Sequence, residues 1–431
     1  MKSIKFLPFF LPFFFINLKS QTDSLVKELL KESERWKNLK ITGWIQPQLQ
    51  FTDSSGAKNF DGGDFLPNSD KRFIIRRGRV KFTYSAKNSQ YVMQLNATER
   101  GVNLVEAYLK VTDPLTKSFI LTAGTMNRPY SFEIQQSSAD RETPERSRYL
   151  QIITPNERDL GMMLTYQPVA ASRLYGLKID AGLFNGTGIA VPGTTSLNGA
   201  GVVDPDYIKD FISRIHFDKA SKNNKIKFGI GSSLYYGGVL FQNNHWYNEL
   251  KKDTSGNFVW TMQDTVSNPN MKGRIAPRRY YAGDVQFSIK SGIGVTTIRA
   301  EYAQGQQSST KDENKSWATL LATPDVYTRN FNAGCAYFIQ RIGNSKHELV
   351  CKYEWYDPNT ELKGNQIASS LGFTKAEIKY NATGLGYNYY YDEHVKFMFY
   401  YNIVKNEATR VVGYTKDVRD NVFTMRVQYR F

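Results

Sequence analysis

Hydrophobic and polar residues alternate with a period of two along most of the chain after residue 40. The last segment shows the pattern best, because Phe423, Met425, Val427, Tyr429 and Phe431 alternate with mostly polar residues. This alternation predicts strands with one apolar and one polar face. We expect sixteen of them, at residues 40–51, 73–85, 90–97, 103–112, 119–125, 159–167, 174–185, 210–218, 225–236, 279–291, 294–303, 330–341, 347–357, 376–391, 395–404 and 420–431.

The connections between these segments alternate between long and short. The long ones lie at 52–72, 126–158, 186–209, 237–278, 304–329, 358–375 and 405–419, and only 98–102 breaks the series by being short. Long outer loops and short periplasmic turns are typical of outer-membrane barrels, whose tilted strands need about 9–11 residues to cross the bilayer. The alternative is a soluble sandwich or propeller, but no blade repeat is present. We therefore predict an all-β protein, a transmembrane antiparallel β-barrel of about 16 strands with both ends in the periplasm.

The first forty residues follow a different pattern. Lys2 and Lys5 precede an apolar stretch that ends near the small residue Ser20. This is the pattern of a secretory signal peptide, which we place at residues 1–20. Residues 21–39 predict a short amphipathic helix in the periplasm, so the barrel would span 40–431. The expected location is the outer membrane of a bacterial cell.

Composition and charge narrow the functions that such a barrel can have. Aromatic residues make up 14% of the chain, yet the mean hydropathy is −0.48, which fits a sheet with lipid on one face and water on the other. The formal charge of +16 permits nucleic acid, anionic lipid or small anions as partners, and export argues against nucleic acid. Four scattered histidines and two cysteines show no metal-ligand spacing, so we expect no metal and no cofactor.

If the apolar faces meet lipid, the polar faces line the interior of the barrel. This interior would carry more basic than acidic side chains, and such a surplus favours anions. Pairing across strands, for example of Arg299 with Glu301, is the alternative role of these charges. The thirteen basic candidates are Arg77, Arg79, Lys81, Lys110, Lys178, Arg214, Lys227, Lys290, Arg299, Lys352, Lys396, Arg426 and Arg430, and the six acidic ones are Glu106, Asp180, Asp218, Asp284, Glu301 and Glu354.

Two segments hold the densest charge. Arg77, Arg79 and Lys81 fall on one face of the second strand, whereas Arg76 falls on its apolar face, at the rim or at a subunit contact. The third long loop, 126–158, is too long and too charged for a simple cap, so we expect it to fold inward, either as a rigid ion-paired plug or as part of a solute site. Our candidate pore-lining or anion-binding residues are Arg77, Arg79, Lys81, Lys110, Arg128, Arg146, Arg148, Arg214 and Arg299.

Five stretches of the front half of the chain resemble the phosphate-selective porin O and P family. They lie at residues 74–80, 105–109, 123–131, 145–147 and 158–162. The resemblance implies a sixteen-stranded homotrimer with an inward third loop, in contact with outer-membrane lipid and selective for small anions such as phosphate. It also implies arginines that descend the pore and a lysine cluster deeper inside. Arg77 and Arg79 match the arginine-rich strand of the family.

The sequence favours passive diffusion of small solutes over catalysis. His216 and His394 fall on predicted interior faces, but no serine has an evident orienting acid, so we expect no enzyme. The alternative function is surface binding through long outer loops such as 237–278. Cys335 and Cys351 fall on the apolar faces of adjacent strands, where we expect packed thiols and not a disulfide.

Overall fold

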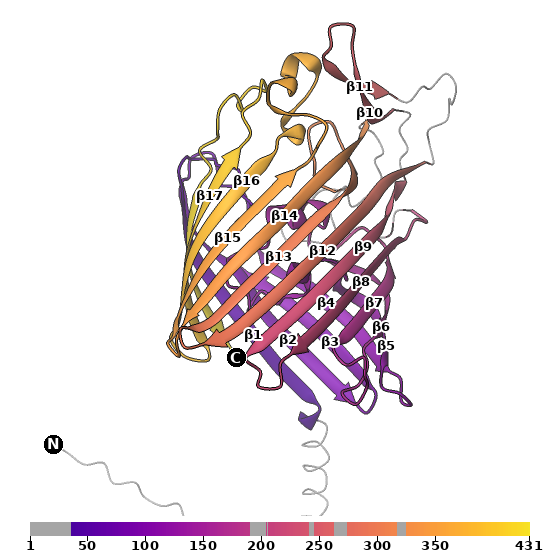
Figure 1. The fold of residues 1–431 in the computed structure, drawn as a ribbon, viewed down its shortest axis with the longest axis vertical. Helices are drawn as coiled ribbons and strands as arrows, with labels where there is room; N and C mark the ends of the chain where they lie inside the picture. Colours follow the sequence, from indigo (N-terminus) through magenta and orange to yellow (C-terminus); the bar gives the residue numbers. More distant parts are fainter. Residues whose placement is uncertain (1–35, 190–203, 205, 241–244, 263–273, 317–324) are drawn as a thin grey trace, which may run out of the picture.

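The computed structural model describes residues 36–189, 204, 206–240, 245–262, 274–316 and 325–431. The predicted signal peptide and nearly all of the predicted helical segment at 21–39 lie outside the described residues. The rest forms a barrel of tilted strands with the C-terminus at the end opposite β10 and β11, the end that we predicted to face the periplasm (Figure 1). No helix in the described ranges is long and apolar enough to cross a membrane.

Sixteen of the eighteen strands in the described ranges form one closed antiparallel wall, because β18 pairs with β1. This confirms the predicted fold. The wall consists of β1 (Leu39–Thr52), β2 (Lys71–Ala86), β3 (Ser89–Thr98), β4 (Gly101–Thr112), β5 (Phe119–Asn127), β6 (Arg158–Tyr166), β7 (Leu177–Phe184), β8 (Asp210–Ala220), β9 (Ile226–Leu240), β12 (Ile275–Ser291), β13 (Gly294–Ser309), β14 (Val326–Ile342), β15 (His347–Asp357), β16 (Tyr380–Tyr390), β17 (Val395–Asn406) and β18 (Val422–Arg430).

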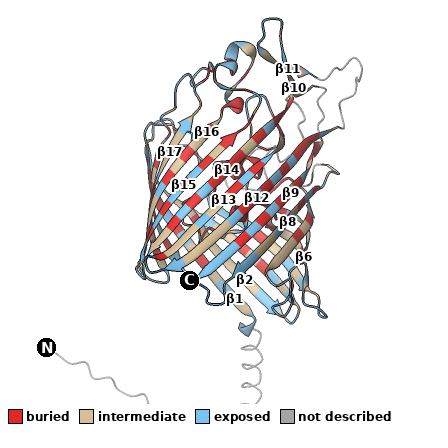
Figure 2. Cartoon of the chain, viewed as in Figure 1, coloured by how far each residue is buried: buried red, intermediate tan, exposed pale blue. Residues whose placement is uncertain are grey.

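Exposure alternates along the wall strands as the hydrophobic pattern predicted. In β18, Thr424 and Arg426 are buried toward the interior, whereas Met425 and Val427 are exposed on the outside. Figure 2 shows the same alternation of buried and exposed positions on most strands. The outward residues are mainly apolar, which suits a surface that faces lipid.

The remaining two strands form a hairpin among the outer loops, which the sequence did not predict. β10 (Trp246–Lys252) and β11 (Phe258–Met262) pair with each other, and Leu250, Phe258 and Trp260 pack against apolar residues of other outer loops. Three 3₁₀ turns lie nearby, η1 (Gly364–Gln366), η2 (Ser369–Leu371) and η3 (Lys375–Glu377). Because η3 occupies the start of the predicted strand at 376–391, β16 begins only at Tyr380.

A bulge in β2 corrects the expectation for Arg76. Gln46 of β1 pairs with Arg77, but the next residue, Pro47, pairs with Ile75, so Arg76 is an extra residue in the ladder. A bulge re-aims a side chain, and Pro47 has no N–H to contribute at this point. Arg76 therefore turns inward and not toward the rim or a subunit contact.

The register between β14 and β15 corrects the expectation for the two cysteines. Cys335 pairs with Glu354, whereas Cys351 pairs with Phe338. The turn at 343–346 sets this register and places the two thiols on opposite faces of the wall. Cys335 is buried inside and Cys351 is exposed outside, so they cannot bond to each other within one barrel.

The two faces of β12 give a direct test of this orientation. Val285 is exposed on the outside, and the adjacent Gln286 lines a cavity inside. We expect Val285→Arg to destabilise the barrel in lipid vesicles by about 2–4 kcal/mol, because it moves a charge into hydrocarbon. Gln286→Arg is the matched control and should have little effect. Urea unfolding followed by tryptophan fluorescence measures both, and equal stability of the two variants would contradict the assignment of faces.

Candidate functional site in the barrel interior

The third long loop folds into the barrel, as predicted. It runs from residue 128 to residue 157 and contains α2 (Phe132–Gln135) and α3 (Arg148–Ile153). Most of its side chains are buried. It contacts wall strands far apart in the sequence, since the backbone N–H of Phe132 donates to Glu301 of β13 at 3.0 Å and that of Arg148 to Glu354 of β15 at 3.2 Å.

One side of the interior is an apolar core. Tyr149, Leu150, Ile152 and Ile153 of the loop pack against inward aromatic residues of the wall, and the hydroxyl of Tyr149 donates to Glu301. The sequence did not reveal this core, because tyrosines at the polar positions of an alternating strand suggest a face in contact with water. The wall residues of the core include Phe184, Tyr235, Tyr280, Phe331, Tyr356 and Tyr380. Large buried aromatic rings fill this side of the interior.

The base of the loop is held by a buried ion pair. Arg128 and Asp159 approach to 3.0 Å, and their side chains are almost completely buried. Asp159 also accepts hydrogen bonds from the backbone N–H groups of Gly186 at 2.8 Å and Gly188 at 3.1 Å. Arg128 was a candidate anion ligand, but here its guanidinium is committed to a carboxylate that joins the third loop to the fourth.

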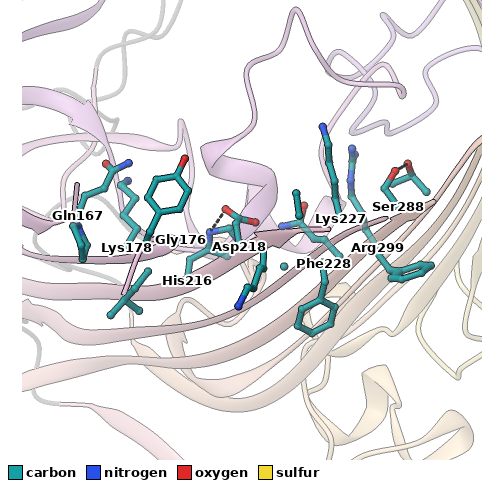
Figure 3. A pocket seen from close by; sticks show the side chains of 18 residues that line it. Gln167, Gly176, Lys178, His216, Asp218, Lys227, Phe228, Ser288 and Arg299 are labelled. Atoms are coloured by element: carbon teal, nitrogen blue, oxygen red, sulfur yellow. Dashed lines mark hydrogen bonds and ion pairs between the residues drawn. The ribbon is translucent and has the colours of Figure 1, made fainter. Parts of the chain in front are cut away.

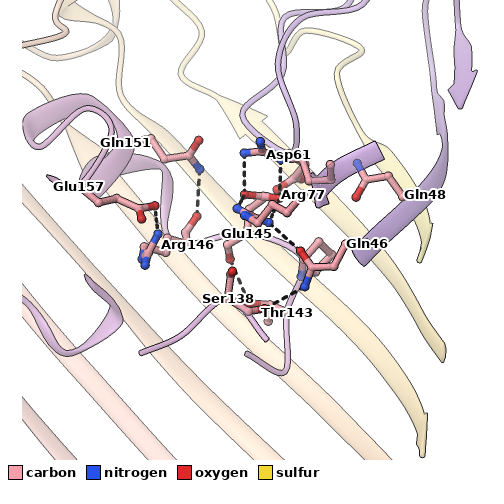
Figure 4. A network of polar contacts seen from close by, with 12 residues as sticks. Gln46, Gln48, Asp61, Arg77, Ser138, Thr143, Glu145, Arg146, Gln151 and Glu157 are labelled. Carbon is pink, nitrogen blue, oxygen red and sulfur yellow. Dashed lines mark hydrogen bonds and ion pairs between the residues drawn. The ribbon is translucent and has the colours of Figure 1, made fainter. Parts of the chain in front are cut away.

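The segment of the loop from residue 137 to residue 146, which we call the tip, crosses to β1, β2, β17 and β18. Glu145 at its end meets three arginines, with Arg76 Nε at 2.8 Å, Arg77 Nη2 at 2.6 Å and Arg426 Nη2 at 3.0 Å. Figure 4 shows the contact with Arg77. Burial alone would raise the pKa of the Glu145 carboxyl, but these three guanidiniums outweigh it and hold the pKa well below its usual range. Glu145 therefore stays charged in mildly acidic solution.

Most of the other candidate residues are also paired. Arg146 pairs with Glu157, and Lys81 approaches Glu106 at 3.2 Å. Further pairs inside the barrel involve candidates from several strands. They are Arg214 with Asp284 at 2.6 Å, Arg299 with Glu142 at 2.9 Å, Lys178 with Asp180 at 2.7 Å, Lys352 with Glu354 at 2.5 Å and Arg430 with Asp140 at 2.5 Å. Arg299 thus pairs with the loop and not with its strand neighbour Glu301.

A few basic groups have no carboxylate within 4.0 Å in the part of the chain that the structure describes. Among the nine candidate pore-lining or anion-binding residues these are Arg79, Lys110 and Arg148, and Arg141 of the tip joins them. Arg148 stacks between Phe60 at 4.2 Å and Tyr380 at 3.7 Å. Nε of Arg79 and both Nε and Nη1 of Arg141 are buried without a hydrogen-bond partner in the chain. Buried donors of this kind are rare and point to water or a ligand.

Two of the unpaired groups, Arg79 and Lys110, lie with three paired ones along one stretch of wall. We call this stretch the basic wall and define it as Arg79, Lys81, Lys110, Arg158 and Lys178. Arg79 interacts electrostatically with Arg158 and with Arg141 of the tip. The ammonium groups of Lys81 and Lys110 lie 6.0 and 5.4 Å from the centre of one ring, that of Tyr108. Lys110 in turn interacts with Lys178. The basic wall therefore runs from the tip toward the periplasmic end.

Two neighbouring cavities lie at that end and meet the basic wall at Lys178. The larger, of about 600 Å³, is lined by Lys178, His216, Lys227 and Arg299 among others (Figure 3). The smaller, of about 270 Å³, shares Lys178, His216 and Arg299 with it and reaches Gln135 of the loop. Within the described residues, no cluster of His, Cys, Asp or Glu is arranged to hold a metal ion.

Comparison with known proteins identifies the fold. No family model and no curated protein matches the sequence. The outer membrane channel DcaP of Acinetobacter baumannii is similar in structure, with a TM-score of 0.51, 11% identity and coverage of 91% of this chain and 97% of that one. A loop-deletion mutant of OmpT, an outer membrane protein of Vibrio cholerae, is also similar, with a TM-score of 0.50 and 11% identity. This match covers 91% of this chain and 99% of that one. The chain thus has an outer-membrane β-barrel fold, and the predicted location follows from it.

The ion pair at the base of the loop predicts how the loop responds to protease. In Arg128→Ala, Asp159 keeps its charge but loses its counter-ion, a change that costs about 3–5 kcal/mol at buried sites. We expect trypsin to cut the loop at Arg141, Arg146 or Arg148 at least about tenfold faster than in the parent protein. Arg100→Ala, which breaks an exposed pair with Glu99, is the control. Equal cleavage rates in both variants would show that Arg128 does not hold the loop.

Proposed function

We propose that this barrel is an outer-membrane porin through which small anions diffuse passively, with phosphate or another oxyanion as the preferred solute. The observation that carries the proposal is the set of unpaired basic groups beside the tip. Nitrogen atoms of Arg79 and Arg141 are buried donors without a partner in the described chain, and Lys110 has no described carboxylate within 4.0 Å. The apolar core occupies another part of the interior, so a hydrated solute is left with the basic wall.

Ion pairing inside the barrel supports this sign of selectivity. A paired arginine and glutamate contribute little net charge, so the unpaired groups decide the potential that an entering ion meets. Arg79 and Lys110 of the basic wall and Arg141 of the tip are such unpaired groups, and all three are basic. A charged lining surrounded by low-dielectric protein and lipid raises the local concentration of the opposite ion.

The kinds of side chain on the basic wall favour oxyanions among the small anions. Guanidinium groups offer two parallel donors that match phosphate and carboxylate oxygens, whereas an ammonium acts as a point charge. Arginines lie nearest the tip, and Lys81, Lys110 and Lys178 lie beyond them. This order agrees with the arginines and deeper lysine cluster that the resemblance implies, although the sequence alone did not locate the lysines.

Two further features belong to the proposal. The exposed apolar residues on the outside of the wall, such as Leu164, Ile215 and Ile298, suit contact with outer-membrane lipid. The homotrimer stays a prediction from the family resemblance.

Measurement of ion selectivity tests the proposal. In planar bilayers with a potassium chloride gradient, the reversal potential of the parent protein should show a preference for chloride. In the double variant Arg79→Gln/Arg141→Gln, the anion-to-cation permeability ratio should fall several-fold, because two unpaired charges are removed. Arg100→Gln, whose side chain is largely exposed in the short second loop, should leave the ratio unchanged. Cation preference of the parent protein would overturn the proposal.

The first outer loop adds an expected pH dependence. Asp61 lines a narrow space with Arg146 and Arg148 and accepts a hydrogen bond from Asn402. Burial, aided by the charges of Glu354 and Glu145, raises its pKa to about 6. Asp61 is therefore negative above this pH and neutral below it, so anion preference should rise as the pH falls from about 8 to about 5.

Asp61→Asn isolates this effect from other titrating groups. The variant should show at pH 8 the anion preference that the parent protein reaches at pH 5. Reversal potentials measured at both pH values in the same salt gradient give the comparison. If the anion preference changes as much between pH 8 and pH 5 in the variant as in the parent protein, Asp61 is not the source of the pH dependence.

A further inference from the structure

The contacts of Glu145 are those of a bound anion. Its two carboxylate oxygens accept five hydrogen bonds from Arg76, Arg77 and Arg426, in which Arg76 and Arg77 each use two nitrogen atoms. This is the paired geometry in which guanidinium groups bind phosphate and carboxylate ions. Three positive charges against one negative charge leave the set with a surplus that a dianion would neutralise better than a single carboxylate.

The wall positions two of these arginines independently of Glu145. Arg426 Nε donates to Gln48 Oε1 of β1 at 2.9 Å, and Arg77 Nη1 donates to Gln46 Oε1 at 3.2 Å. Arg76 is directed inward by the bulge in β2. The three guanidiniums, which we call the arginine site, therefore belong to β2 and β18, and those of Arg77 and Arg426 have wall partners that would remain if the carboxylate moved away.

The tip that carries Glu145 is held differently from the rest of the loop. It has no helix or strand, and its contacts with the wall around the arginine site are polar. The carbonyl of Ser138 accepts from Gln46 at 2.9 Å and that of Ala139 from Gln428 at 3.0 Å. The apolar core holds the loop on both sides of the tip, through Ile134 and through Tyr149 and Leu150. The tip can thus move without disturbance of the core, and water or salt can replace its polar contacts.

We propose that Glu145 is a tethered anion that fills an oxyanion-binding site made by Arg76, Arg77 and Arg426, and that a soluble oxyanion binds there by displacing it. The inference rests on the proposed function, since it assumes that anions enter the barrel. It adds a competition, because the solute binds only to the fraction of molecules in which Glu145 has left the arginine site. Occupancy by solute also releases the tip, so the solute itself changes the shape of the passage.

Removal of the competitor tests the inference. Glu145→Gln replaces the carboxylate by a neutral amide, which holds the guanidiniums far less well. We expect the concentration of inorganic phosphate that halves the chloride current to fall at least about tenfold relative to the parent protein. Glu142→Gln is the matched control, because it removes a carboxylate of the same tip that pairs with Arg299 and not with the arginine site. In Glu142→Gln, the phosphate concentration that halves the chloride current should stay within about twofold of the parent value.

Movement of the tip gives a second readout in a chain that keeps Glu145. Ser138 belongs to the tip and is buried, so a cysteine at this position should react slowly with a soluble thiol reagent. We expect phosphate to accelerate labelling of Ser138→Cys, and chloride at the same ionic strength to have no such effect. The parent protein supplies the background from Cys335 and Cys351. This measurement decides the matter if Glu145→Gln fails to assemble, as judged by heat-dependent mobility in gels.

The outcomes separate the inference from the proposed function. Anion preference of the parent protein, together with unchanged phosphate block in Glu145→Gln, would overturn the tethered anion and leave the porin proposal intact. Labelling of Ser138→Cys at the same rate with and without phosphate would do so as well. Cation preference of the parent protein would overturn the proposed function, whatever the variant shows.

Discussion

The pairing of β18 with β1 is the contact on which the rest of this structure depends. A sheet in lipid cannot leave backbone N–H and C=O groups unpaired, and closure removes both of its edges. Closure also creates an interior separated from lipid by a single layer of strands. A charged loop can enter that interior only if its charges meet partners, because burial of an isolated charge is expensive. The ion pairs of the third loop with strands around the barrel follow from this requirement.

The interior is divided between two kinds of chemistry. Tyr149 and its aromatic neighbours make an apolar core that fixes the loop against β7–β9 and β12–β16, much as a helix packs on a sheet in a soluble protein. The other part is polar, and the residues of the tip meet β1, β2, β17 and β18 through hydrogen bonds and ion pairs. The apolar packing and the polar pairing of the loop thus involve different parts of the wall. Changes to the polar part need not weaken the packing that holds the loop in place.

The hydrophobic pattern was sufficient to predict the wall, because lipid imposes one apolar face on every strand and makes the period of two visible. It failed where local geometry departs from that period. The bulge at Arg76, the register that separates Cys335 from Cys351 and the 3₁₀ turn before Tyr380 each depend on a turn or a partner strand. Inward tyrosines such as Tyr280 were missed because a phenol ring suits either face. The partners of the candidate arginines were also out of reach, since Glu142 and Glu145 approach Arg299 and Arg77 across the barrel.

The bulge in β2 has a consequence for how much charge a barrel wall can carry. Regular alternation allows one inward side chain for about every 6.7 Å of strand, which sets an upper limit on linear charge density. The extra residue at Arg76 places two consecutive guanidiniums on the same side and locally exceeds that limit. A single inserted residue can in this way raise the local density of charge on the interior wall of a barrel, without a change in the number of strands or in the diameter.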